Sequence, residues 1–428
     1  MFSGFPKNGY PCYVTRRQIL HHKRQCAMSK CEGEEMKKRS KDMSRKKTFF
    51  FSALFTLVIM MNVPMQVNAF YTDEETYGVQ EKAYTEQEEV IMLLPVKELQ
   101  VDDLDIVIET VGASYFLEVN GILDDGNSVE LAEEASYLSS NADVVFPYRG
   151  RLLAMGTGFA VVTVSYGDVS VDVNVSVLAP LEIPDDIPTA QNSNVDISIA
   201  REMVFCEWEP LLLMESWTDS DLYTRKYYYP GTTYTGILYT QKTCSSTKTF
   251  LENAANVNSG FYTPLVRKTV TIKDEQGNVV EKRTYYQPKF GNDCSGFLSL
   301  AWGISRKTTL GFFDGIKDGT FDKVGQYTIP SDYLNMSSAS QEKLQKELKA
   351  AYGSLQQGDA LVCRKIKTTL DENGKEVKSE VGHTFMVYLT NPSTKLVYVY
   401  EQTNPNAIIA TWTYDMLANG NYLPFRKK

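Results

Sequence analysis

The strongest constraint on the fold is a pair of alternating segments joined by a short turn. Residues 160–166 and 169–177 place apolar side chains at every second position, and Gly167-Asp168 separates them. Because successive side chains of a strand point to opposite faces, this pattern predicts a β-hairpin with one buried face. Further short alternating runs between residues 91 and 178 are typical of an all-β sandwich.

Several residues of this stretch resemble a known module. They are Tyr137-Leu138-Ser139-Ser140-Asn141, Val144-Val145, Gly150, Ala154, Gly156-Thr157-Gly158 and the closing hairpin. The set is similar to bacterial group 2 immunoglobulin-like domains, so residues 91–178 are expected to form such a sandwich. The resemblance implies a spacer or adhesive module that associates with the cell surface and carries no catalytic residues.

The first 69 residues have the anatomy of a leader with a signal peptide. Residues 43–47 are basic, residues 48–63 are apolar, and Ala69 is a small residue suited to signal peptidase. The apolar run is shorter than the ~20 residues that a membrane span needs, although an uncleaved anchor stays open as the alternative. Residues 1–42 are basic and aperiodic, so we expect translation to start at Met43. The protein is therefore expected to be secreted or associated with a bacterial cell wall.

Charge and composition divide the rest of the chain. The net charge is −9, and residues 1–69 hold 13 basic and 4 acidic residues, which leaves 31 basic and 49 acidic residues and a net charge of −18. Such an acidic exported chain is a poor partner for nucleic acid or anionic lipid. Acidic residues 70–90 predict a flexible segment, and Pro- and Asp-rich residues 179–195 predict a linker to a last domain, residues 196–428.

Few cysteines follow the predicted signal peptide. They are Cys206, Cys244, Cys294 and Cys363. Four are too few for a disulfide scaffold. One bridge between Cys206 and Cys244 is open, and so is a pair of free buried thiols. Since the sequence has no CxxC motif and no histidine cluster, we expect no metal and no cofactor. We also expect a monomer.

Cys294 lies where a helix is expected to begin. Asp293 is a preferred N-cap residue, apolar residues follow at helical spacing to Trp302, and Gly303 can end the helix. The exposed N–H groups of a first turn favour a thiolate and can hold an oxyanion. Gly296 leaves room for a substrate backbone. The alternative is a buried structural cysteine.

His383 is the only histidine after residue 69. Residues 358–362, 382–389 and 395–402 predict three strands of an antiparallel meander, which brings the end of the third strand beside the start of the second. Glu401 or Gln402 would then reach the imidazole and fix its tautomer. A structural histidine is the alternative.

These motifs together resemble a family of hydrolases. Asp293-Cys294-Ser295-Gly296-Phe297, Gly358-Asp359-Ala360-Leu361-Val362, residues 382–388 and Tyr400-Glu401-Gln402 occur in the order found in NlpC/P60 peptidases, a papain-like family. The resemblance implies an α+β papain-like domain with an antiparallel sheet. It also implies that Cys294 is the nucleophile and His383 the general base. Many members have a second histidine in third position. Glu401 is closer to the acidic residue of CHAP amidases, and Gln402 stays open beside it.

The same resemblance names a substrate. Family members carry a tyrosine before the cysteine, and Tyr239 and Tyr286 are the candidates for it, with Asp293 and Ser295 beside the thiol as further substrate-binding residues. The implied reaction is cleavage of an amide bond in peptidoglycan stem peptides, by a DL-endopeptidase that is a cysteine peptidase. A CHAP-like N-acetylmuramoyl-L-alanine amidase, an inactive wall-associated adhesin and a secreted protease or transglutaminase-like toxin are the alternatives.

Two charged segments look alike. Residues 267–280 and 364–377 share a pattern of basic residues, an acidic pair and a glycine. Each predicts a β-hairpin with a glycine turn. Flaps at the border of a cleft and plain solvated hairpins are both compatible with the pattern.

Overall fold

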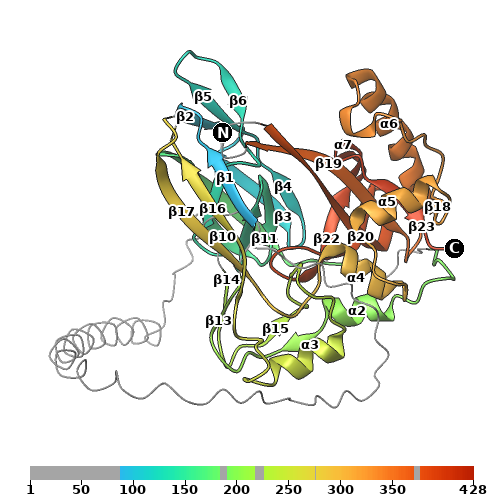
Figure 1. Cartoon of the computed structure of the whole chain (residues 1–428). Coiled ribbons are helices and arrows are strands. Elements are labelled where there is room, and N and C mark those ends of the chain that lie inside the picture. The colour runs from blue at the N-terminus through green and yellow to red at the C-terminus, as the bar shows by residue number, and fades with distance from the viewer. Residues whose placement is uncertain (1–86, 184–189, 217–225, 275, 371–375) are drawn as a thin grey trace, which may run out of the picture. The chain divides into compact units, whose positions relative to one another are not determined.

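The computed structural model describes residues 87–183, 190–216, 226–274, 276–370 and 376–428 (Figure 1). All of them belong to one unit, Thr76–Lys428. The predicted leader and signal peptide, residues 1–69, lie outside the described residues. Within the described part of the chain, no helix is both long and apolar enough to cross a membrane.

The predicted hairpin forms the centre of a four-stranded sheet. Strands β10 (Gly158–Tyr166) and β11 (Val169–Ala179) pair antiparallel around Gly167, whose φ is +58°. The sheet order is β3-β11-β10-β7, with β3 at Asp105–Thr110 and β7 at Ser136–Ser139. The alternate valines of the hairpin face a core of their own, in which Val162 and Val173 are fully buried. The hairpin prediction is therefore confirmed.

Two smaller sheets complete the N-terminal β region, residues 96–179. One has the order β2-β5-β6, at Val96–Val101, Val119–Leu123 and Ser128–Glu130. The other has the order β4-β9-β8, at Ser114–Phe116, Arg151–Ala154 and Val145–Tyr148. All four side chains of β9 are buried, including the charged Arg151.

The largest sheet has six strands and is antiparallel throughout. Its order is β18-β23-β19-β20-β21-β22. The strands lie at Asp322–Lys323, Leu423–Arg426, Ala360–Leu370, Glu376–Asn391, Leu396–Gln402 and Ala407–Thr413. The predicted meander corresponds to β19, β20 and β21 and is confirmed.

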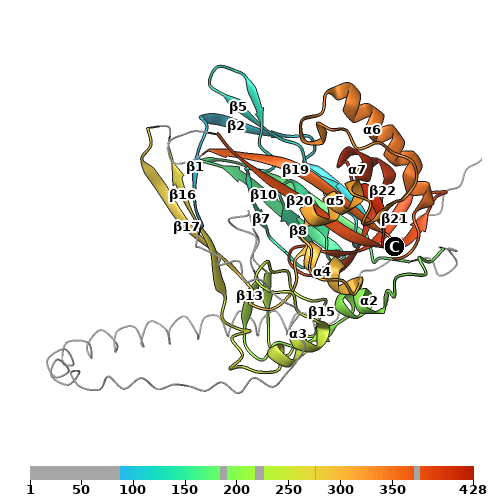
Figure 2. The same ribbon diagram turned by 45° about the vertical axis from the view of Figure 1, so that its right-hand side comes forward.

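Short helices pack against this sheet (Figure 2). They are α2 at Ser198–Val204, α4 at Cys294–Ala301, α5 at Thr309–Lys317, α6 at Ser338–Ala351 and α7 at Tyr414–Asn419. A further helix, α3 at Thr247–Ala254, packs Phe250 against Trp208. Two 3₁₀ turns occupy Tyr333–Asn335 and Tyr352–Ser354. Helix α4 contacts β20, and α5 contacts β19 and β20. An aromatic cluster of Trp302, Phe312, Phe321 and Phe425 fills the space behind them.

The remaining strands form a hairpin and two short pairs. Strand β16 (Leu265–Lys273) pairs antiparallel with β17 (Val279–Gln287) and parallel with β1 (Gln87–Met92). The short pairs are β12-β15 at Glu207–Trp208 and Tyr234–Thr235, and β13-β14 at Met214–Ser216 and Lys226–Tyr228. The predicted flexible segment 70–90 thus ends in a strand, and its earlier residues lie outside the described part.

Both charged segments are hairpins, as predicted. The first, β16–β17, turns at Gly277 with φ of +82°. The second joins β19 and β20, which pair from Ala360 with Met386 to Leu370 with Glu376. The turn of the second hairpin, residues 371–375, is outside the described residues.

The expected α+β papain-like class is wrong. Strands account for 41% of the structure and helices for 19%, and the strands are spread over many small sheets. This content fits an all-β fold better. The physical reason is that strands dominate the chain from β1 to β11 and that β19 and β20 extend well beyond the motifs, whereas most helices have only six to nine residues.

Candidate functional site

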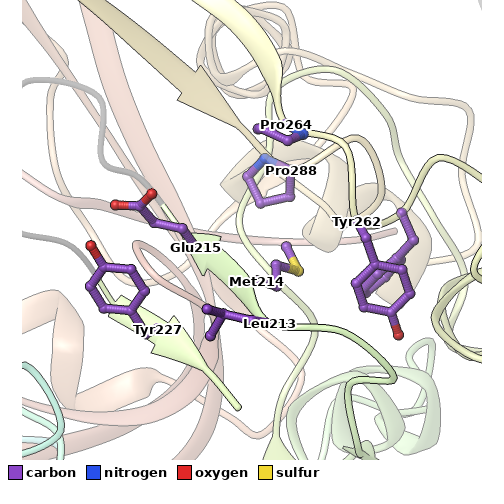
Figure 3. Close-up of a pocket in the computed structure, with 8 residues that line it drawn as sticks. Leu213, Met214, Glu215, Tyr227, Tyr262, Pro264 and Pro288 are labelled. Carbon is purple, nitrogen blue, oxygen red and sulfur yellow. The ribbon is translucent and has the colours of Figure 1, made fainter. Parts of the chain in front are cut away.

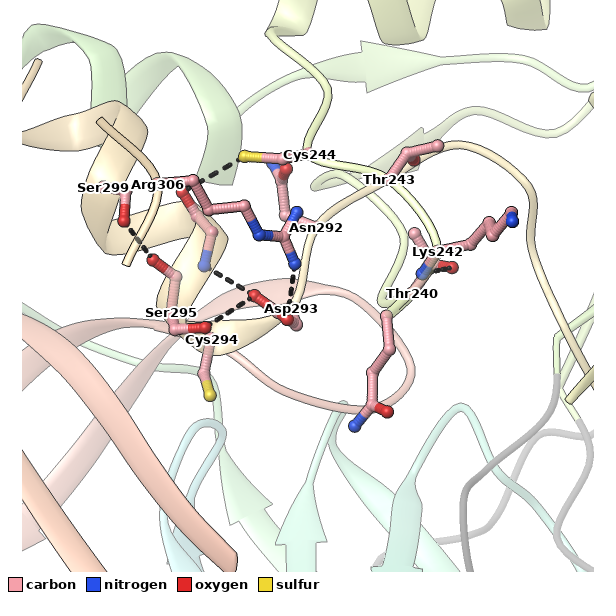
Figure 4. A network of polar contacts seen from close by, with 12 residues as sticks. Thr240, Lys242, Thr243, Cys244, Asn292, Asp293, Cys294, Ser295, Ser299 and Arg306 are labelled. Carbon is pink, nitrogen blue, oxygen red and sulfur yellow. Dashed lines mark hydrogen bonds and ion pairs between the residues drawn. The ribbon is translucent and has the colours of Figure 1, made fainter. Parts of the chain in front are cut away.

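Helix α4 places Cys294 at its first position. The carboxylate of Asp293 caps the helix, because its Oδ1 accepts a hydrogen bond from Gly296 N at 2.5 Å. Oδ1 also accepts from Ser295 Oγ at 3.0 Å, and Oδ2 accepts from Arg306 Nη2 at 2.8 Å (Figure 4). The predicted cap is confirmed, and Asp293 and Ser295 are occupied with each other and with the helix end.

Gly296 does not serve the purpose expected for it. A Cβ at this position would lie 2.9 Å from Asp293 Oδ1 and 3.1 Å from Cys244 Sγ. The missing side chain therefore makes room for the cap and for a neighbouring thiol. The expectation that it opens the site to a substrate is wrong.

The structure brings Cys294, His383 and Glu401 together. His383 lies on β20 and its Nε2 is 2.9 Å from Glu401 Oε1. The Cys294 side chain adjoins the imidazole closely enough to raise its pKa. Because Nε2 is held by the carboxylate, Nδ1 is the ring nitrogen left for the thiol. The order thiol, imidazole, carboxylate is the arrangement that nucleophilic catalysis by cysteine requires.

Gln402, the other residue left open for the third position, faces away from the histidine. Its side chain is buried, and Nε2 donates to the carbonyl of Ile237 at 3.1 Å. Adjacent residues of a strand point to opposite faces, so only one of the pair can meet His383. Glu401 is that residue.

Glu401 is 0% exposed and its carboxylate accepts four hydrogen bonds. Oε1 accepts from His383 and, at 2.5 Å, from Arg151 Nη1. Oε2 accepts from Arg151 Nη2 at 3.1 Å and from Trp412 Nε1 at 3.0 Å. The guanidinium also lies over the Trp412 ring, 4.8 Å from its centroid. A buried carboxylate with all its acceptor sites used keeps its charge and a fixed position.

The ionisation of this pair follows from these contacts. Burial works toward a raised pKa for Glu401, but the charges of Arg151 and His383 outweigh it and hold the pKa well below its usual range. Burial works toward a lowered pKa for His383, but hydrogen bonds to Cys294 and Glu401 outweigh it and raise the pKa to about 10. The site therefore favours an imidazolium beside a carboxylate at neutral pH.

Tyr239 adjoins the thiol. Its segment runs between the backbone before Cys294 and the turn after Glu401, since Tyr239 N donates to Pro405 O and Thr240 N to Asn292 O, both at 2.9 Å. Burial and the neighbouring charge of Cys294 raise the pKa of Tyr239 well above its ordinary value, so its phenol is neutral at pH 7. Tyr286, the other candidate, lies on β17 opposite Val266.

The close approach of these segments depends on two glycines. A Cβ on Gly291, whose φ is +147°, would lie 2.1 Å from Leu238 O. One on Gly236, with φ of +87°, would lie 2.2 Å from Ala407 O. Both distances are far inside van der Waals contact, so only glycine permits this packing.

The other cysteines are free thiols in the described chain. Cys206 is buried and Cys244 is half-buried, and no bridge joins them. Burial raises the pKa of each to about 11, and Cys244 Sγ lies 3.5 Å from Gly296 O. Of the two states that the sequence left open, the structure has the free thiols. Their raised pKa values leave them weak nucleophiles at neutral pH.

Three residues of the site were missed from the sequence. Arg151 and Trp412 hold the carboxylate, and Thr309 Oγ1 lies 4.0 Å from Cys294 Sγ at the start of α5. Of the three, only the tryptophan could have drawn attention in the sequence. In the structure it lies on strand β22, opposite Val397 of β21. Within the described residues, no group of three or more His, Cys, Asp or Glu side chains could hold a metal ion.

A separate hollow of about 230 Å³ lies at β13 and β14 (Figure 3). Its lining is mostly apolar and aromatic, and includes Leu213, Met214, Tyr227, Tyr262, Pro264 and Pro288. None of the three residues Cys294, His383 and Glu401 lines it.

Comparison with known proteins adds little. No family model matches the chain. No curated protein matches it either. Among solved structures, domains 4 and 5 of the S-layer protein SbsC align with 20% of this chain and 53% of their own, at 17% identity and a TM-score of 0.18. Domains 5–6 align with 31% of this chain and 82% of their own, at 15% identity and a TM-score of 0.18. Likeness at this level carries no argument about fold, location or activity.

Proposed function

We propose that the protein is an exported cysteine hydrolase that cleaves an amide bond in peptidoglycan stem peptides through a thioester. The observation that carries the proposal is the cluster of Cys294, His383 and Glu401, in which Glu401 hydrogen-bonds the imidazole and the neighbouring thiol lies at a helix N-terminus. The site's geometry supports the reaction class. The motif resemblance to NlpC/P60 peptidases supports the substrate.

The first half of the reaction forms the acyl-enzyme. The Cys294 sulfur, paired as thiolate with the His383 imidazolium, attacks the amide carbonyl carbon and a C–S bond forms. The oxygen becomes an oxyanion, and N–H groups of the first turn of α4 are the donors available to it. One such donor contributes on the order of 3 kcal/mol. The C–N bond then breaks while His383 gives its proton to the leaving amine.

The second half releases the acid. The neutral imidazole takes a proton from water, and the hydroxide attacks the thioester carbonyl. The C–S bond breaks, which regenerates the thiolate beside the imidazolium and frees a carboxylate. Glu401 keeps the imidazole in one tautomer throughout, because its Oε1 holds Nε2 at 2.9 Å.

The substrate proposal has a test. The full chain is incubated with purified peptidoglycan and the released fragments are read by mass spectrometry. Wild type is expected to release fragments with new amine and carboxylate ends, and Cys294→Ala to release none. Cys206→Ala removes a thiol far along the chain from the site and is the matched control, which should keep the wild-type profile. Equal profiles for wild type and Cys294→Ala would contradict the proposal, as would an inert wild type.

The bond that is cut decides between the two amide specificities. A new carboxylate on D-Glu indicates the DL-endopeptidase. A free lactyl group on muramic acid with a free amine on L-Ala indicates the amidase. We place the reaction at the bacterial cell wall, outside the cell, because residues 43–69 resemble a signal peptide.

A further inference from the structure

The carboxylate of the candidate site is held by a residue from the N-terminal β region. Arg151 lies on β9, and 250 positions separate it from Glu401. Its guanidinium donates two hydrogen bonds to the two carboxylate oxygens. A planar fork that meets a carboxylate in this way fixes both distance and orientation.

Arg151 is itself fixed. Only 8% of its surface is exposed, its Nε donates to Ser114 Oγ at 2.8 Å, and the Trp412 ring lies against its guanidinium. Each of these contacts is made with the site or with the strand beside it. A buried guanidinium whose donors are satisfied in this way is a specific, structured interaction, unlike a solvent-exposed ion pair.

Further contacts join the same region to the strand behind the site. Thr411 N donates to Gly112 O at 2.9 Å, and a Cβ on Gly112 would lie 2.5 Å from Ile409 O. Phe116 lies against Trp412, with ring centroids 5.8 Å apart. The backbones of the N-terminal β region and of β22 therefore meet at close range beside Arg151. This packed interface holds the arginine in its position at the site.

The charges of the site alternate when Arg151 is included. The groups around Glu401, His383 and Cys294 that can carry charge include Arg151, Tyr422, Tyr239, Asp293 and Cys363, which lies opposite His383 on β19. Burial raises the pKa of Tyr422 and of Tyr239 well above the ordinary value, so both are neutral. Arg306 already pairs with Asp293. In the proposed mechanism, the series of thiolate, imidazolium, carboxylate and guanidinium is then electrically balanced.

We propose that Arg151 is a positioning residue of the candidate site, and that the N-terminal β region is thereby part of the catalytic unit and not a spacer. The guanidinium keeps the shared proton on His383 and away from Glu401, because it stabilises the ionised carboxylate. Without it, a buried carboxylate faces a single cation, and the proton moves toward Glu401. The imidazole then becomes neutral and no longer supports the thiolate. This inference rests on the proposed cysteine hydrolase function.

The test measures the thiol and needs no substrate. The full chain is treated with iodoacetamide between pH 4 and pH 10, and alkylation of the Cys294 peptide is followed by mass spectrometry. In Arg151→Met the acid limb of the rate–pH profile is expected to move to higher pH, and the alkylation rate near pH 6 to fall on the order of 10- to 100-fold. Hydrolysis, where it is measurable, should fall by a similar factor.

Control variants separate positioning from loss of structure. Arg426 likewise donates two hydrogen bonds to a buried carboxylate, that of Asp359, both at 2.7 Å and outside the site. Arg426→Met should leave the alkylation profile unchanged. Arg151→Lys keeps the charge without the fork and should restore part of the acid limb. In a Glu401→Gln background, Arg151→Met should add little further change, since both act through one group.

Each outcome decides the matter. If Arg151→Met does not fold, as judged by thermal unfolding, Arg151→Lys and Ser114→Ala carry the test and should shift the profile in the same direction by less. Profiles that coincide with wild type in the folded variants overturn the inference. A shifted profile in a protein that leaves peptidoglycan intact keeps Arg151 as a positioning residue and refutes only the proposed substrate.

Discussion

Trp412 donates its indole N–H to Glu401 Oε2 at 3.0 Å, which completes the set of bonds around a carboxylate that is fully buried. The same ring stacks on Phe385 at 5.2 Å between centroids. The tryptophan thus supplies both a donor and an apolar wall behind the histidine. A phenylalanine at this position would keep the wall and lose the donor.

Trp412→Phe is therefore expected to slow hydrolysis roughly 10-fold or more, because a hydrogen bond to a buried charged group contributes about 1.5–3 kcal/mol. The measurement is the rate of fragment release at saturating and limiting substrate. Trp302→Phe is the matched control, since Trp302 donates to Gly358 O at 3.0 Å away from the site. Equal losses of activity in both variants would show that the Trp412 bond contributes only to stability.

The raised pKa of His383 makes a prediction about stability. A group whose pKa is higher in the folded protein contributes fully below its unfolded pKa, about 6.5, and loses the contribution as pH rises through the folded value, about 10 for His383. The free energy of unfolding of wild type minus that of His383→Gln should be largest near pH 6 and shrink toward pH 10. Urea unfolding across this range measures it. A difference independent of pH would contradict an imidazolium beside Glu401 in the folded protein.

The lowered pKa of Glu401 gives a prediction about stability at acid pH. Its pKa is held below the ordinary range by Arg151 and His383 against the effect of burial. It therefore stabilises the fold above its unfolded pKa, about 4.3, and the stabilisation is lost as pH falls below that value toward the folded pKa. Glu401→Gln should remove the part of the acid destabilisation that comes from this group. Thermal unfolding of both proteins between pH 2 and pH 6 is the measurement. Parallel curves would argue that the carboxylate does not titrate with folding.

The two candidate tyrosines make separable predictions. Tyr239 is neutral and adjoins Cys294, and we expect its hydroxyl to donate to a bound substrate. Tyr239→Phe should lower the rate of fragment release about 10-fold and leave the iodoacetamide profile of Cys294 in place, since the charge pairs are untouched. Tyr286→Phe, on β17, should change neither quantity. Identical kinetics for the two variants would remove Tyr239 from the site.

Local patterns predicted local structure well. The N-cap at Asp293, the hairpin around Gly167 and the three-stranded meander all depend on contacts within or between neighbouring elements, and all are present. Their sequence signals are short-range, because caps and turns are made by the side chains and φ angles of a few consecutive residues. The placement of His383 near the end of a neighbouring strand followed from the same reasoning.

The choice between Glu401 and Gln402 could not be made from the sequence. Strands β20 and β21 pair with a register shift between Val387 and Leu389. One extra residue reverses which face each following side chain occupies. No composition signal marks this bulge, so the phase of the third strand was undetermined until the pairing was known.

Arg151 was beyond prediction for a different reason. It reaches Glu401 across 250 positions and from a stretch whose pattern indicates only a β-sandwich. A single arginine on a strand has the same sequence appearance whether it faces solvent or a buried carboxylate. The expected α+β class failed similarly, since the motifs describe a few turns and strands, while much of the strand content lies outside them, as in β10–β11 and β16–β17.

The packing of the segment that carries Tyr239, beside the thiol, gives a last prediction. Gly291→Ala would put a Cβ 2.1 Å from Leu238 O at a φ of +147°, so the segment that carries Tyr239 must move. Gly277→Ala also places alanine at a positive φ, +82°, but with no atom within 4 Å. Both changes add backbone strain of about 1–3 kcal/mol, and only the first also breaks a close contact. Gly291→Ala should therefore lower the unfolding temperature more than Gly277→Ala. It should also reduce the hydrolysis rate per folded molecule, where the fraction of folded protein is measured by alkylation of Cys294. Equal effects of the two substitutions on unfolding and on activity would mean that the position of the Tyr239 segment does not depend on the approach of Gly291 to Leu238.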